Sequence, residues 1–150
     1  MTKHKHILAC LLLAGTAACT GASASGTPEE AYARGVQAFE AGQPRTARIE
    51  FMNALQANPN DRRARVMQAR TYLALGDGVA AESEVRRARE AGAADAETRH
   101  LVAHALLLQN QPQRAIEESE GAAPEHAAYA ARVRGRAYMA LDDNARAAQE

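Results

Sequence analysis

A repeat of 34 residues runs through most of this chain and limits the folds it can adopt. Small residues recur at Gly35, Ala69 and Ala103, each 34 positions after the last, and Gly135 follows 32 positions later. A unit of this length cannot bury its apolar face alone, so it must stack on its neighbours. Four further columns keep the same spacing: Ala38, Tyr72, Leu106 and Tyr138; Gly42, Gly76, Asn110 and Asp142; Pro44, Gly78, Pro112 and Asn144; and Ala47, Ala81, Ala115 and Ala147.

The residue types in these columns predict two helices per unit. The column that begins with Gly42 suits a left-handed C-terminal cap, and the column that begins with Pro44 suits the first turn of a second helix. The small residues allow the two helices to approach closely, and Pro59 closes the first unit. We expect helices near 29–41, 44–57, 62–75, 79–91, 95–109, 112–121, 126–140 and 144–150.

The repeat resembles the tetratricopeptide repeat. The first unit supplies the small, aromatic and proline positions of that pattern, and the second supplies most of them: Gly35, Ala47, Phe51, Ala54 and Pro59, then Ala69, Tyr72, Ala81 and Ala88. The tryptophan often found near the start of a unit is absent. The resemblance implies an all-α fold of antiparallel helix-hairpin repeats, stacked into a right-handed superhelix of about three and a half repeats.

The array is expected to span residues 28–150, in units 28–61, 62–95, 96–127 and an incomplete 128–150. The third unit is two residues short, and the loss falls between Ala122 and Ala128. Gly121 and Pro124 should therefore end its second helix early. The incomplete last unit predicts either the front part of a longer repeat protein or an end that another chain covers.

The first residues predict export from the cell. Residues 1–18 read as a signal peptide, with Lys3 and Lys5 before an apolar run that is too short to span a membrane. Residues 19–27 read as a flexible tether. The segment from Leu13 to Cys19 resembles a bacterial lipobox, although Thr16 stands where leucine is usual. Processing at this lipobox would make Cys19 the lipidated first residue of the mature protein. Ordinary cleavage after Ala24 is the alternative.

Charge and cysteine content narrow the classes of partner. Both lysines lie in the leader, and without them the 18 acidic residues exceed the basic residues by two. A strong basic field is therefore missing, which argues against nucleic-acid binding. Cys10 would be lost with the leader, so at most one cysteine survives and no internal disulfide can form. We expect a protein on the periplasmic face of the envelope, anchored by an N-terminal lipid.

The first helix of each unit should line a concave groove. The columns there predict an apolar N-terminal end and a basic C-terminal end. Arg70, His104, Arg132 and Arg136 could hold an acidic peptide or an anionic glycan, since arginine suits bidentate contact with carboxylates. Alternatively, these charges merely keep the groove hydrated. The predicted partner-binding residues are Tyr32, Val36, Phe39, Val66, Arg70, Leu73, His100, His104, Arg132 and Arg136.

Catalytic and metal chemistry find little support. His100 and His104 lie four residues apart, on one helix face, but Leu101 stands where the zinc-protease motif requires glutamate. We expect two exposed histidines and no resident metal or cofactor. Ser119 occupies a packing column, and the carboxylates Glu117, Glu118 and Glu120 are expected to form a hydrated helix face. The chain is therefore predicted to be a binding module and not an enzyme.

A second resemblance concerns residues 47–93. The residues that carry it are Asn53-Ala54-Leu55-Gln56, Asn58-Pro59, Asp61, Ala64-Arg65, Tyr72-Leu73, Gly76-Asp77, Ala81-Glu82, Glu84-Val85-Arg86, Ala88 and Gly92-Ala93. They resemble the early repeats of the tetratricopeptide lipoproteins found with PEP-CTERM/exosortase systems. The resemblance implies an envelope scaffold for protein–protein interaction in exopolysaccharide and protein sorting. The alternative is a polysaccharide-export accessory protein that contacts the glycan or its synthase directly.

Overall fold

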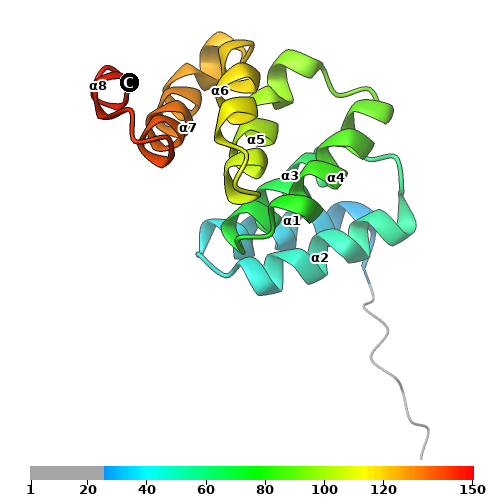
Figure 1. Ribbon diagram of the computed structural model, residues 1–150. Helices are drawn as coiled ribbons and strands as arrows, with labels where there is room; N and C mark the ends of the chain where they lie inside the picture. Colours follow the sequence, from blue (N-terminus) through cyan, green and yellow to red (C-terminus); the bar gives the residue numbers. More distant parts are fainter. Residues whose placement is uncertain (1–25) are drawn as a thin grey trace, which may run out of the picture.

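The computed structural model describes residues 26–150. The predicted signal peptide, Cys19, the alternative cleavage point after Ala24 and most of the tether lie outside the described residues. Within residues 26–150 the regular structure is entirely helical (Figure 1). Its elements are α1 (Pro28–Glu40), α2 (Pro44–Ala57), α3 (Arg62–Ala74), α4 (Gly78–Glu90), α5 (Asp95–Leu108), α6 (Pro112–Glu120), the 3-10 helix η1 (Pro124–His126), α7 (Ala127–Ala140) and α8 (Asn144–Ala147).

Consecutive helices pack in pairs, as the 34-residue repeat predicts. The closest partners are α1 with α2, α3 with α4, and α5 with α6. The first helices of successive pairs also contact one another, α1 with α3, α3 with α5, and α5 with α7. These first helices form the inner face of the array, and the second helices flank it (Figure 1). The predicted all-α hairpin repeat is confirmed.

Each first helix ends in the same way. Gly42, Gly76, Asn110 and Asp142 all have positive φ angles, between 58° and 79°. At the second of these turns the amide of Asp77 donates to the carbonyl of Tyr72 at 2.9 Å, and the amide of Gly76 donates to the carbonyl of Leu73 at 3.1 Å. This is the Schellman arrangement, which satisfies carbonyls that the helix leaves without partners. The column predicted to form left-handed caps therefore does so in all four units.

The core consists mainly of alanine and medium-sized aliphatic residues. The largest buried cluster joins α3, α4, α5, α6 and α7, and it includes the fully buried Leu101 and Leu106. A smaller cluster between α1 and α2 surrounds Phe51, whose ring has no exposed surface. Small residues in the repeat columns let these helices lie close together, so the core extends along the array and has no single centre.

The third unit departs from the others, as its missing residues predict. Helix α6 ends at Glu120, and the chain then forms η1 before α7 begins at Ala127. The amide of Ala123 donates to the carbonyl of Ala96 at 3.0 Å, which fixes this connection against the start of α5. One predicted boundary was wrong, since α8 ends at Ala147 instead of continuing to Glu150. The other helix ends lie within one residue of their predicted positions, and His126 belongs to η1.

Candidate partner-binding site

Two adjoining cavities open on the inner face of the array. The first, of about 230 Å³, is here called the basic cavity, and it is lined by His104, Tyr129, Arg132, Val133 and Arg136. The second, of about 450 Å³, is called the apolar cavity, and it is lined by Phe39, Arg70, Leu73, Ala74, His100, Leu101, His104, His126 and Tyr129. The cavities share His104 and Tyr129. No carboxylate lines either of them within residues 26–150.

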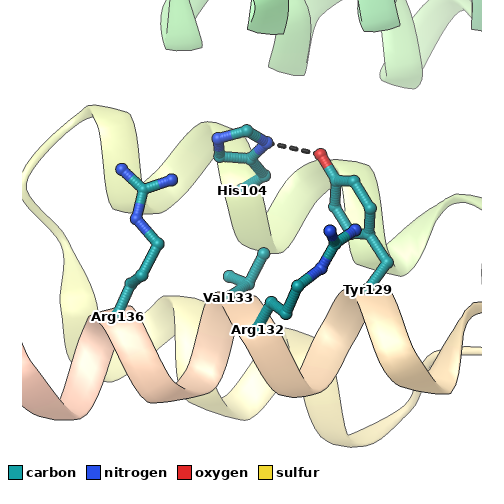
Figure 2. Close-up of a pocket in the computed structure, with 5 residues that line it drawn as sticks. All are labelled: His104, Tyr129, Arg132, Val133 and Arg136. Carbon is teal, nitrogen blue, oxygen red and sulfur yellow. Dashed lines mark hydrogen bonds between the residues drawn. The ribbon is translucent and has the colours of Figure 1, made fainter.

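A hydrogen bond between His104 and Tyr129 separates the two cavities. Nδ1 of His104, on α5, lies 2.5 Å from the hydroxyl of Tyr129, on α7. Figure 2 shows that the other ring nitrogen, Nε2, lies on the side of Arg136. When the phenol donates to Nδ1, the neutral imidazole carries its proton on Nε2. Burial lowers the pKa of His104, and the charges of Arg136 and Arg132 lower it further. His104 is therefore neutral near pH 7, and in this tautomer its Nε2 is free to donate a hydrogen bond.

Two closely packed histidines line one side of the apolar cavity, with their rings tilted by 34°. His100 lies one turn before His104 on α5, and its ring centroid is 3.8 Å from that of His126 in η1. The ring of Tyr129 meets His100 edge-on at 5.2 Å. His100 is only 3% exposed, and its Nδ1 has no hydrogen-bond partner among residues 26–150. Burial lowers the pKa of His100 to about 4, and the nearby His126 and Arg70 contribute to the shift.

The expectation of two exposed histidines was wrong. His100 is buried, and His104 is half-buried. The cause is the short connection after α6, which brings η1 and the first turn of α7 against α5 and covers both rings. Within residues 26–150, no group of three histidine, cysteine, aspartate or glutamate side chains is arranged to hold a metal ion.

Three arginines project around the two cavities without a carboxylate partner in the described part of the chain. The guanidinium carbon of Arg132 lies 5.3 Å from the centre of the Tyr129 ring, a cation–π contact. Arg70 donates to the sulfur of Met67 at 3.9 Å. Arg136 lines the basic cavity beside His104 (Figure 2). These arginines come from α3 and α7, so the array assembles a positive site from separate units.

The structure brings seven of the ten predicted groove residues to these cavities. They are Phe39, Arg70, Leu73, His100, His104, Arg132 and Arg136. Tyr32, Val36 and Val66 lie outside both cavities. Tyr32 and Val36 pack against the cluster around Phe51, and Val66 packs against the large cluster. A role in partner binding stays a prediction for all ten.

Sequence reasoning missed Tyr129 and His126. Neither residue type recurs at the equivalent positions of the other units: His126 lies within the shortened segment between Ala122 and Ala128, and Tyr129 follows it directly. The shortening itself is the signal that could have drawn attention to this segment. Among the other polar residues considered, Ser119 is buried, as its packing column predicts. Glu117 and Glu120 are exposed, as expected, whereas Glu118 is half-buried and forms an ion pair with Arg99 at 3.2 Å.

The comparisons with known proteins agree with the fold. Residues 38–105, from the end of α1 into α5, match the tetratricopeptide repeat family. No curated protein sequence matches the chain significantly. Tetratricopeptide arrays are typically non-catalytic, and they suggest a scaffold for protein–protein interaction. The helix pairs, the recurring caps and this match together support a tetratricopeptide repeat protein.

Proposed function

We propose that this chain is a scaffold whose inner face binds an acidic segment of a partner protein. The observation that carries the proposal is that three arginines without an ion pair converge on two adjoining cavities that no carboxylate of the described residues lines. Four other arginines also lack an ion pair within residues 26–150, but they line neither cavity: Arg45, Arg48, Arg62 and Arg114. Arg70, Arg132 and Arg136 have no ion pair within residues 26–150. In the same part of the chain, nine other arginines lie within 4.0 Å of a carboxylate: Arg34, Arg63, Arg65, Arg86, Arg87, Arg89, Arg99, Arg134 and Arg146.

Paired and unpaired arginines act differently on a ligand. A carboxylate neutralises the field of its arginine and occupies the donors that would otherwise bind an anion. The three groove arginines keep both their field and their donors. Burial lowers the pKa values of His100 and His104, so these two histidines add hydrogen bonding without adding charge near pH 7. An acidic segment would thus meet cations that no internal group of the described chain competes for.

A double substitution tests this function. Arg70→Ala with Arg136→Ala should weaken binding of a fluorescent peptide of alternating glutamate and glycine by about tenfold or more, as expected for two charge-assisted contacts. Fluorescence anisotropy at fixed ionic strength measures the affinity. Arg45→Ala with Arg48→Ala is the matched control, because both arginines are exposed on α2 and lie outside the cavities. Equal binding by the two double variants would contradict the proposal.

We further propose that the scaffold acts at the periplasmic face of the envelope, held by a lipid on Cys19. The leader, the residues around Cys19 and the resemblance to PEP-CTERM/exosortase-system lipoproteins support this placement. No helix within residues 26–150 is both long enough and apolar enough to cross a membrane. Cys19→Ser should move the protein from the membrane fraction to the soluble fraction. If cleavage follows Ala24 instead, the substitution will leave the distribution unchanged.

Cross-linking in living cells addresses the pathway. Recovery of exosortase or polysaccharide-export components with the tagged protein would support an adaptor in exopolysaccharide and protein sorting. Recovery of other envelope assembly machinery alone would keep the scaffold and reject that pathway. The Arg70 and Arg136 double variant should recover the same partner in smaller amount than the Arg45 and Arg48 control.

A polysaccharide-export accessory protein is the second candidate. The unpaired arginines favour it as well, because uronate sugars present carboxylates of the same charge. Treating cells with polysaccharide-degrading enzymes before cross-linking separates the two candidates. A protein complex that survives the treatment supports direct protein binding, whereas a complex that disappears supports contact through the glycan.

A further inference from the structure

The apolar cavity is larger and less polar than an acidic group alone requires. Its volume of about 450 Å³ falls within the range of roughly 300–1,000 Å³ that is usual for ligand sites. Phe39, Leu73, Ala74 and Leu101 supply apolar walls from α1, α3 and α5. A carboxylate placed against these walls would lose hydration without gaining a partner, so the cavity suits an apolar group.

Ring systems form the remaining walls. The rings of His100 and His126 pack closely at a tilt of 34°, and Tyr129 lies edge-on to His100. Aromatic rings prefer such edge-to-face and offset contacts with one another, and arginine at the rim adds cation–π attraction. Arg70 stands at this rim. The unpartnered Nδ1 of the nearly fully buried His100 adds hydrogen-bonding capacity that nothing in the described chain uses.

The adjoining basic cavity suits an anionic group on the same ligand, next to the apolar group. Arg132, Arg136 and Nε2 of His104 line the basic cavity, and it adjoins the apolar cavity because His104 and Tyr129 line both. One short segment can therefore fill both. A glycan could supply the anion, but it would not match the walls made by Phe39, Leu73 and Leu101.

We propose that the two cavities together recognise a peptide segment in which an aromatic side chain lies beside a carboxylate, the ring in the apolar cavity and the acid in the basic cavity. The proposal rests on the proposed binding of an acidic partner segment and specifies its chemistry. The apolar walls and the unpaired arginines together favour a protein segment as the occupant.

Four end-blocked peptides test the pairing in the full chain. One contains glutamate, phenylalanine and glutamate between glycines. The second replaces phenylalanine by alanine, the third replaces both glutamates by glutamine, and the fourth makes both changes. The phenylalanine–glutamate peptide should bind about tenfold or more tightly than either single replacement, because burial of one large apolar side chain has at least that effect. Isothermal titration calorimetry gives the affinities.

A cavity-filling variant tests the location. Ala74 lines the apolar cavity from an exposed position on α3, so Ala74→Phe should fill the space without disturbing the core. It should remove the advantage of the phenylalanine peptide over the alanine peptide. Ala33→Phe is the matched control, since Ala33 is exposed on α1 and lines neither cavity. Circular dichroism of both variants checks that the helices and their melting transition are retained.

The outcomes separate this inference from the function on which it rests. Equal affinity for the phenylalanine and alanine peptides would overturn the aromatic pairing, while glutamate-dependent binding would still support the acidic-segment function. Equal affinity for the glutamate and glutamine peptides would overturn both. Retention of the phenylalanine advantage in Ala74→Phe would place the ring elsewhere and overturn the proposed cavity.

Discussion

At the scale of single residues, the repeat columns balance large side chains against small ones. Gly35 faces the ring of Phe51, and a Cβ added at Gly35 would lie 2.6 Å from that ring. The equivalent pairs in the next two units are Ala69 with Val85 and Ala103 with Ser119, all of them buried. In the first unit the large Phe51 therefore lies opposite glycine. In the second and third units the smaller Val85 and Ser119 are paired with alanine.

A double-mutant cycle tests this balance. Gly35→Ala should destabilise the protein by about 1–3 kcal/mol through overpacking, and Phe51→Val should destabilise it by about 2 kcal/mol through lost burial and a cavity. The double variant reproduces the alanine and valine pair of the second unit, so it should lose less than the two single effects combined. Urea unfolding gives the three free energies. Strict additivity would show that the two positions do not share one space.

The buried histidine predicts a pH-dependent stability. Burial lowers the folded-state pKa of His100 to about 4, whereas an unfolded histidine titrates near 6.5. Between these values the unfolded chain binds more protons, so stability is full above pH 6.5 and falls as the pH is lowered toward 4. We expect the free energy of unfolding to decrease by about 2 kcal/mol between pH 7 and pH 5. Urea titrations at the two pH values measure it.

His100→Phe is the control for this pH effect. It keeps a ring beside His126, Tyr129, His104 and Arg70 but cannot titrate, so most of the decrease should disappear. Burial also lowers the pKa of His104, which leaves a smaller residual effect. The carboxylates whose pKa values are lowered are Asp61, Asp143 and Glu150, and they lose their stabilising charge only below their ordinary range. An unchanged decrease in His100→Phe would therefore assign the effect to another group.

At the scale of helices, the sequence predicted most boundaries because turn chemistry repeats with the columns. The cap column beginning with Gly42 and the column beginning with Pro44 locate the ends of successive helices to within about a residue. The candidate site was less predictable. Its arginines follow columns, but His126 reaches His100 through a connection that breaks the repeat. A change of period signals a local rearrangement without specifying which side chains it brings together.

The helix caps allow a comparison between residue types in one backbone conformation. A Cβ at Gly76 would meet no atom within 4 Å, so Gly76→Ala tests the backbone alone, at a φ of 79°. It should cost about 1 kcal/mol. Asn110 has a φ of 58° in the equivalent turn, and Asn110→Gly should stabilise by about 0.5 kcal/mol. Thermal unfolding compares both with the unmodified protein, and a stabilising Gly76→Ala would contradict the strain argument.

At the scale of the whole molecule, stability should be highest in the middle of the array. Each pair packs mainly on its neighbours, and the largest core cluster joins α3 to α7. Pairs in the middle are supported on two sides, whereas α8 is short and has no buried residue. Native-state hydrogen exchange should thus show the strongest protection in α3 and α5 and weak protection in α8. Uniform protection along the chain would indicate instead a single cooperative unit.

The apolar cavity has a mechanical consequence for such an array. The principal contacts of α1 are with α2 and α3, yet the cavity is lined by residues from α1 to α7. Each unit otherwise packs mainly on its immediate neighbours. A bound segment would contact several units at once, including units that are not adjacent. It would resist stretching and bending between the first and last units. The partner would then become a structural member of the scaffold that holds it.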